Sequence, residues 1–448
     1  MRDSFGSLFS IYSALTNSDI KNRLVNNSFW SIIGNVIIQG TGFGVAVVAA
    51  RILGKTIYGE LGILNSIILL LSLLFNFGLG LTSTKFIAEN FKKDKSQSGK
   101  LIGFLYLTSI GISLTLFIIY FLFLYKIPVL IADAPHLSIQ IRVCGLVILL
   151  YSIINTQTGI LMGFEGFKSI VKVNVIRGTA VFLFSAAGIY FWQLNGAIFG
   201  LIAEGTVVVL INHLLINKIA QSYNISIQYS IIKNYYPLLW KFSFPAFLSS
   251  LVVPFAIWAT NSFLINSPNG FAELGQYNVV NQWKNIILFI PMTINNAILP
   301  LLSSEISKQN LASPQKIIKL SLIINGLSSF LLALVLIIGN DYFMSIFGNE
   351  YLTSPLTTGV ILFSAVISSV IAPIGQWIVA SNKMWLALIM NFGWCLILLV
   401  ASWIFIKNGS GAIGLGASFL IAYFFHALWV IGYYNKYNHS VPRIPPND

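Results

Sequence analysis

The stretch Gly275–Ser303, GQYNVVNQWKNIILFIPMTINNAILPLLS, is long enough to cross a lipid bilayer, yet it contains a charged residue. Lys284 lies inside it, within a polar patch at residues 281–285, and Pro291 and Pro300 interrupt the apolar part. A charge inside an apolar segment is costly and normally faces a protein interior or a water-filled cavity. Prolines are tolerated at that depth where neighbouring helices or water satisfy the freed carbonyls. The stretch therefore predicts a helix that forms the wall of a polar cavity.

Composition places the whole chain in a membrane. Of its 448 residues, 56% are hydrophobic and 9% are charged, whereas a soluble domain has about a quarter charged residues. The apolar segments are long rather than short and alternating, so helices are favoured over membrane β-strands. Cys144 and Cys395 both lie inside apolar segments and are expected as small core residues. We predict an all-α integral membrane protein.

Segments of about 20 apolar residues suffice to cross the hydrocarbon core, and the chain offers twelve of them. The second is expected at Leu61–Ser83. The predicted organisation is a cytoplasmic tail at 1–27, a six-helix bundle at 28–216, a cytoplasmic linker at 217–240, a second six-helix bundle at 241–434 and a cytoplasmic tail at 435–448.

The distribution of basic residues predicts the orientation, because cytoplasmic loops carry the excess of Lys and Arg. With both termini inside, the outside loops hold only Arg51, Lys55, Lys126, Arg142 and Lys407. The net charge of +13 therefore reflects the orientation of the chain in the membrane. We expect membrane lipids as its partner and do not expect nucleic acid.

Short motifs recur between the two halves. Gly59–Gly62 (GELG) matches Ala272–Gly275 (AELG), and Gly196–Ile198 (GAI) matches Gly411–Ile413 (GAI), at a nearly constant offset. Both halves have six spans in the same orientation, which indicates a parallel repeat about an axis along the membrane normal. Two matching bundles around a central cavity are the predicted architecture.

The sequence resembles the O-antigen type polysaccharide biosynthesis flippases of the multidrug/oligosaccharidyl-lipid/polysaccharide exporter superfamily. The motifs that carry the resemblance are Ala50–Gly54 (ARILG), Tyr58–Gly59, Phe77–Gly80 (FGLG), Phe244–Pro245, Gly275–Tyr277 (GQY), Asn281–Lys284 (NQWK) and Phe347–Tyr351 (FGNEY). The resemblance implies a MATE-like fold in the bacterial inner membrane. It also implies translocation of an undecaprenyl-pyrophosphate-linked oligosaccharide to the periplasmic face by alternating access, with a polysaccharide polymerase and a chain-length regulator as partners.

Such a substrate needs cations for its pyrophosphate, and the candidates are Lys284, Arg177 and Arg51. Each has a structural alternative. Arg177 lies near the cytoplasmic start of its span and would reach the surface by snorkelling, while Arg51 lies where its span ends and would cap that helix or meet headgroups. Lys284 lies deepest in its span, so its side chain is the one least able to reach the membrane surface by snorkelling.

Amides and one carboxylate complete the candidate set. The resemblance places the first, second, seventh and eighth spans around the cavity, which favours Gln39, Asn76, Asn261 and Gln282 as glycan contacts. The alternative for each amide is a hydrogen bond between helices. Glu204 is a carboxylate inside the sixth span and is a candidate for ion coupling, the alternative being a structural partner to a cation such as Arg177.

The sequence lacks motifs that are typical of catalytic or cofactor sites. The chain shows no Gly-x-x-x-x-Gly-Lys phosphate loop and no Cys/His metal spacing, so we expect a protein that is not an enzyme and uses no cofactor or metal. The alternatives within transport are a multidrug or toxin extruder and a lipid II flippase. An O-antigen polymerase is less favoured, because the outside loops lack a sizeable reactive segment.

Overall fold

The structure is a computed structural model that describes residues 19–91, 94–131, 133–164, 166–229, 243–307, 312–381 and 383–440. Every regular element in these residues is a helix, as predicted. The longer helices are α2 (Asp19–Asn76), α3 (Leu79–Asn90), α4 (Lys95–Ile119), α6 (Ser138–Gly163), α7 (Phe167–Ser222), α9 (Phe244–Ile265), α10 (Gly270–Ser307), α11 (Ala312–Ile338), α13 (Pro355–Ala380), α14 (Met384–Lys407) and α15 (Gly411–Ser440). The short ones are η1 (Tyr120–Leu124), α5 (Lys126–Ile131), η2 (Pro135–Leu137), α12 (Asn340–Ser345) and η5 (Asn349–Tyr351).

Two of these helices, α2 and α7, each contain two membrane spans. A straight helix of the 58 residues of α2 would be about 87 Å long, far more than a bilayer needs. The break in α2 falls at Gly54, whose φ of 73° and ψ of 170° suit a residue without a side chain. In α7 the break falls at Trp192 and Gln193. Each long helix therefore folds into a hairpin.

The predicted number of spans follows from this geometry. Eight helices of the described chain are long and apolar enough to cross a membrane. Two of these are the α2 and α7 hairpins, so the eight helices contain ten membrane-crossing segments. Helix α9 has a shorter apolar stretch, Ser250–Ile265, and together with α10 it would make up the twelve spans expected. The second span ends at Asn76 rather than at Ser83, because Phe77 and Gly78 adopt positive φ angles of 51° and 72° and redirect the chain into α3.

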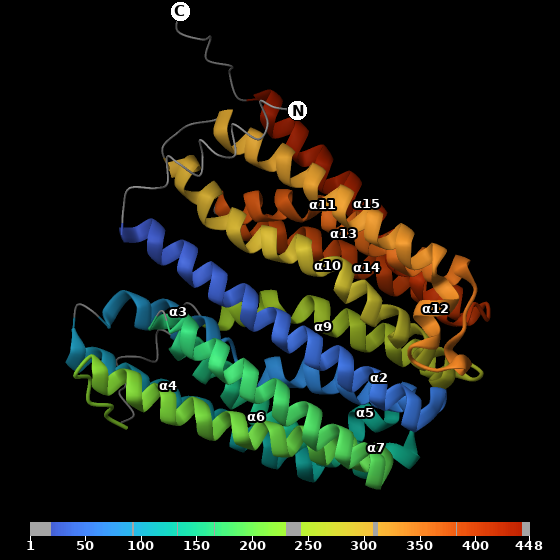
Figure 1. Cartoon of the computed structure of the whole chain (residues 1–448), viewed down its shortest axis with the longest axis horizontal. Coiled ribbons are helices and arrows are strands. Elements are labelled where there is room, and N and C mark those ends of the chain that lie inside the picture. The colour runs from blue at the N-terminus through green and yellow to red at the C-terminus, as the bar shows by residue number, and fades with distance from the viewer. Residues whose placement is uncertain are drawn as a thin grey trace, which may run out of the picture.

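The helices form two lobes, which Figure 1 shows as a blue-to-green group from α2 to α7 and a yellow-to-red group from α10 to α15. Helix α9 lies between them and packs against α2 and α14. Helix α7 continues to Ser222, so it extends into the segment expected as the linker. The second part of that linker, residues 230–240, and the greater part of both expected tails fall outside the described residues.

The lobes are joined beside α12, at the end that lies opposite the start of α2 and the end of α15 (Figure 1). We refer to these two helix ends as the termini of the described chain. The largest buried apolar cluster of the described chain contains Ile63 from one lobe and Val280 and Phe347 from the other. Hydrogen bonds cross the same seam, among them Arg51 Nε to Ile346 O at 2.8 Å, Tyr351 Oη to Ala50 O at 3.1 Å, and Lys55 Nζ to Gln276 Oε1 at 2.9 Å. Packing and hydrogen bonding therefore close this end.

Candidate functional site

A cavity of about 420 Å³ lies between the lobes, enclosed by α2, α9, α10, α14 and α15. Its polar lining residues are Tyr58, Asn65, Ser66, Asn261, Tyr277, Asn278, Asn281, Gln282, Lys284, Asn285, Trp394 and Tyr423. The structure thus brings together three of the predicted site residues, Lys284, Asn261 and Gln282. Among the described lining residues, none is an acid.

Helical periodicity explains why α10 supplies so much of this wall. Asn278, Asn281, Gln282 and Asn285 recur at spacings of three and four residues and share one face of the helix. Val280 and Ile287 lie on the other side and are fully buried in the apolar core. The sequence of α10 therefore presents amides to the cavity and aliphatic side chains to the core.

Lys284 is buried, with 7% of its surface exposed. Its Nζ lies 4.7 Å from the ring centre of Phe419 and 5.9 Å from that of Tyr423. Contact with aromatic faces stabilises a desolvated ammonium by about 2 kcal/mol but does not neutralise it. The described residues place no carboxylate within ion-pair distance of this lysine. The cavity therefore carries a net positive charge.

Four aromatic side chains form the wall behind Lys284. Trp394 packs against Tyr423 and Phe419, with ring centres 5.2 and 6.2 Å apart, and Tyr277 stacks on Phe419 at 6.2 Å. Two buried donors on residues that line the cavity have no hydrogen-bond partner among the described residues, namely Trp394 Nε1 and Asn278 Nδ2. Flat aromatic faces and unsatisfied donors suit a ligand rich in hydroxyl and carbonyl oxygens.

An apolar groove of about 390 Å³ adjoins the cavity. It runs between the first span of α2 and α10, and its lining residues are Val36, Gln39, Gly40, Phe43, Gln282, Asn285, Ile286, Phe289, Ile290 and Leu332. Gln282 and Asn285 line both the groove and the cavity. Gln39, a predicted glycan contact, lies in the groove and not in the cavity. The site thus has a polar and an apolar compartment side by side.

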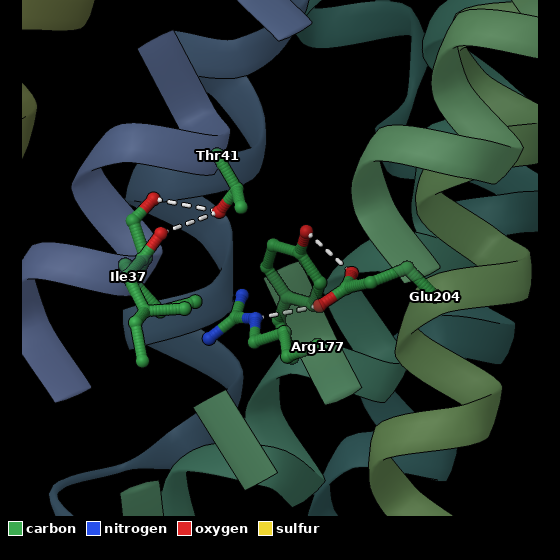
Figure 2. A network of polar contacts seen from close by, with 6 residues as sticks. Ile37, Thr41, Arg177 and Glu204 are labelled. Atoms are coloured by element: carbon green, nitrogen blue, oxygen red, sulfur yellow. Dashed lines mark hydrogen bonds and ion pairs between the residues drawn. The ribbon is translucent and has the colours of Figure 1, made fainter. Parts of the chain in front are cut away.

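Arg177 and Glu204 lie elsewhere, inside the first lobe. Arg177 Nε is 2.6 Å from Glu204 Oε1, and Tyr151 Oη donates to Glu204 Oε2 at 3.0 Å. Figure 2 shows this pair, with the far end of the guanidinium directed towards Ile37 and Thr41 of α2. Neither charged residue lines the central cavity. This contact is the structural alternative considered for Glu204, whereas the alternative considered for Arg177 was snorkelling to the membrane surface; a pyrophosphate contact by Arg177 stays a prediction.

Arg51 and Asn76 also lie away from the cavity. Arg51 is exposed at the closed end, where its Nε donates to Ile346 O. Asn76 is buried, donates to Ser152 O and Thr156 Oγ1 at 3.0 Å each, and accepts from the Gly80 N–H at 3.2 Å. Their polar groups are committed to holding the lobes together and to packing α2 on α6, so the structure does not place them against a substrate in the cavity.

A comparison with protein-family models matches the polysaccharide biosynthesis protein family over residues 24–306. The chain belongs to this family. The match includes the first lobe, α9 and nearly all of α10. The cavity wall formed by α14 and α15 lies beyond it.

Curated relatives of this family member include the EPS I polysaccharide export inner membrane protein EpsE of Ralstonia solanacearum, which is 25% identical over 183 residues. The aligned part covers 41% of this chain and 42% of that protein. The EpsE protein of Ralstonia nicotianae is 24% identical over 186 residues, 42% of this chain and 43% of its own length. The chain therefore spans less than half the length of the relatives it matches.

Solved structures identify the fold of this family member. An inward-facing multidrug resistance MATE family transporter of the MOP superfamily superposes with a TM-score of 0.73 at 14% identity, covering 92% of this chain and all of that one. The outward-facing form of such a transporter gives a TM-score of 0.63 at 16% identity over 96% and 98% of the two chains. A MOP superfamily transporter from Pyrococcus furiosus gives 0.67 at 14% over 96% and 98%. The fold is that of the MOP superfamily.

Several cavity residues of this family member were not predicted as site residues from the sequence. Asn278 and Asn285 could have been found, because both share a helical face with the predicted Gln282. Trp394, Phe419 and Tyr423 gave no comparable signal, since aromatic residues in apolar spans are equally typical of interfacial belts and cores.

Proposed function

We propose that this protein is a flippase that moves an undecaprenyl-pyrophosphate-linked oligosaccharide from the cytoplasmic to the periplasmic face of the bacterial inner membrane. The polysaccharide biosynthesis family and the export role in the name of the EpsE relatives support this proposal. A polysaccharide polymerase and a chain-length regulator remain expected partners.

The observation that carries the proposal is the pair of adjoining compartments. A lipid-linked oligosaccharide has an apolar tail and a polar, anionic head, and these need different surroundings. The groove beside α2 and α10 is apolar, whereas the cavity holds amides, aromatic faces and Lys284. Because Gln282 and Asn285 belong to both, one molecule would fill the two spaces without exposing its head to hydrocarbon.

The seam between the lobes supports alternating access. Hydrogen bonds and apolar packing close the end opposite the termini. With both termini cytoplasmic, as the basic residues predict, this state would load substrate from the cytoplasmic side. Transport would then require the Arg51 and Lys55 hydrogen bonds to break while the lobes rotate.

Glu204 remains our candidate for ion coupling. It is the one acidic side chain that the described structure buries completely, and it is held by Arg177 and Tyr151. A buried carboxylate whose protonation would release a cation is a typical element of ion-driven transport. The pair lies beside the first span of α2, which also forms one wall of the groove.

Two other transport functions were considered. A drug extruder fits the site less well, whereas a lipid II flippase would need the same chemistry. Extruders of cationic drugs usually rely on carboxylates, and the lining of this cavity contains a cation and no acid. A lipid II flippase would need the same two compartments, so only a substrate comparison separates it from the proposed function. We expect no catalytic activity.

The test is reconstitution of the purified protein in liposomes that contain undecaprenyl-pyrophosphate-linked oligosaccharide with a fluorescent sugar. Translocation exposes the sugar to a glycosidase added on the other side. We expect the glycosidase to cleave the sugar faster than it does in protein-free liposomes. Cleavage should also be faster for this lipid-linked oligosaccharide than for lipid II. Equal rates with and without protein, over a range of pH and ion gradients, would overturn the proposal.

A further inference from the structure

His136 contacts both lobes at the closed end. It belongs to η2 of the first lobe, and its Nε2 lies 3.3 Å from Glu60 Oε1 of α2. Its ring also packs edge-to-face against Phe271 of α10, with the ring centres 5.5 Å apart and the ring planes at 77°. The side chain of His136 is 52% exposed, whereas that of Glu60 is 15% exposed. Protons from the solvent therefore reach a histidine that stands between a carboxylate of its own lobe and an aromatic ring of the other.

Glu60 belongs to a motif that recurs in the second half of the chain. Gly59–Gly62 (GELG) matches Ala272–Gly275 (AELG), so Glu273 is the repeat counterpart of Glu60. Glu273 Oε2 accepts the backbone N–H of Ala412 at 2.8 Å, at the start of α15, where a carboxylate stabilises a helix. Glu60 instead faces an ionisable side chain. The same motif therefore caps a helix in one lobe and holds a histidine in the other.

Phe271 lies where the two lobes meet most closely. A Cβ on Gly59 would overlap the carbonyl oxygen of Phe271, so the backbones of α2 and α10 are in contact there. Opening of the seam would separate α10 from α2 and take Phe271 away from the ring of His136. The pair formed with Glu60 would stay intact, because both of its members belong to the first lobe. The aromatic contact is thus the part that depends on whether the seam is closed.

Other charged side chains lie on the elements that meet at this end. They are Arg51, Lys55, Lys126, Asp133, Arg142 and Glu273. Within the described residues, none of them is within ion-pair distance of His136, whereas Glu60 is. Glu60 is therefore the charged group that responds most directly to a change of charge on His136.

Protonation strengthens both contacts of His136. Histidine is the side chain whose charge ordinarily changes between about pH 5 and 8. A positively charged ring attracts a carboxylate and also the negative face of an aromatic ring. We propose that Glu60, His136 and Phe271 form a latch that holds the seam closed when the solvent at that end is acidic.

The latch gives pH a defined effect on the transport cycle. Because the protonated form favours the closed seam, closure is promoted as the pH falls and weakened as the pH rises. With this end on the periplasmic side, as the basic residues predict, external acid would return the emptied protein to its loading state. This inference rests on the proposed function and adds regulation by external pH.

The test measures the distance between two spin labels on the full-length protein in nanodiscs, by electron–electron double resonance. The labels are attached to Leu130→Cys in α5 and Tyr342→Cys in α12, both exposed, while the native cysteines are buried. All variants carry Arg51→Gln, which removes a hydrogen bond across the seam and raises the open population to a measurable level. We expect the ratio of closed to open protein to be about two- to fivefold higher at pH 5.5 than at pH 8.

Two variants assign this pH dependence. His136→Gln removes the titrating group and should abolish it. Phe271→Leu keeps the pair of His136 with Glu60 but removes the ring on the other lobe, and it should abolish the dependence as well. A pH dependence that survives in either variant would overturn the latch, and so would a wild-type ratio that does not change with pH.

His213→Gln is the matched control. His213 also packs edge-to-face against an aromatic ring, that of Tyr106 at 5.7 Å, but both residues belong to the first lobe. This variant should keep the full pH dependence, and its loss would show that His136 is not the responsible group. The liposome assay is scored separately. Translocation of the lipid-linked oligosaccharide without any pH effect on the seam would sustain the proposed function while the latch fails.

Discussion

Gly59 of α2 and Gly275 of α10 cross at the closed end of the lobes with their backbones in contact. A Cβ on Gly275 would overlap the carbonyl oxygen of Lys55, and one on Gly59 would overlap the carbonyl oxygen of Phe271. The two helices therefore meet more closely than any side chain would allow. This crossing lies beside the Lys55–Gln276 hydrogen bond, so it forms part of the seam that would have to open in the proposed transport cycle.

Gly275→Val is expected to weaken this seam and to favour opening at the end opposite the termini. Overpacking a tight contact costs about 1–3 kcal/mol, which shifts an equilibrium by roughly 5- to 150-fold. A cysteine at Asn281 in the cavity then reports the opening through its labelling by a membrane-impermeant thiol reagent. Gly111→Val is the control, because a Cβ at Gly111 meets nothing within 4 Å. Unchanged labelling in Gly275→Val would contradict the assignment of this crossing as a gate.

Arg177→Gln and Glu204→Gln should each destabilise the first lobe more than the double variant does. Glu204 is fully buried while the side chain of Arg177 is 29% exposed, so removing one member leaves a poorly compensated charge and costs at most about 3–5 kcal/mol, whereas replacing both members is often close to neutral. The measurement is a double-mutant cycle on thermal unfolding in detergent. If the effects of the two single variants simply add in the double variant, the pair does not act as a unit.

Asn76 and Asn261 allow packing and binding roles to be separated. Asn76→Ala removes three hydrogen bonds that join α2 to α6 and to the start of α3, and it should lower stability by about 1–2 kcal/mol. Asn261→Ala, at the cavity, should leave the unfolding temperature nearly unchanged and reduce the rate of lipid-linked oligosaccharide translocation. The opposite pattern would show that the roles assigned to these two amides are reversed.

Much of this molecule could be predicted from the sequence, and the exceptions share a cause. Span number and the polar wall of α10 follow from hydropathy and helical spacing, which are local properties. Lys284 was found because a charge in an apolar span is costly wherever the helix lies, and Gln282 because the resemblance places its span beside the cavity. Arg177 and Asn76 are also polar groups in apolar spans, but partners distant in the sequence satisfy them: Glu204 for one, Ser152 for the other. Sequence alone does not tell a satisfied polar group from one that faces a cavity.

Gly40 and Gly42 provide a matched test of the apolar groove. Both lie in the first span of α2, and a Cβ on either would meet nothing within 4 Å, so larger side chains fit at both positions. Only Gly40 lines the groove. Gly40→Phe should therefore occupy the space proposed for the isoprenoid tail and slow translocation in the liposome assay, while Gly42→Phe should leave the rate unchanged.

The Gly40→Phe and Gly42→Phe variants also distinguish binding of the isoprenoid tail from binding of the sugar head. A soluble oligosaccharide has no isoprenoid chain, and its binding to the cavity should be equal in Gly40→Phe and Gly42→Phe when measured by calorimetry. Slow translocation with intact sugar binding in Gly40→Phe is the expected result, because the groove and the cavity are filled by different parts of one molecule. If Gly40→Phe transports at the rate of Gly42→Phe, the tail takes another route, and the groove is not the lipid compartment.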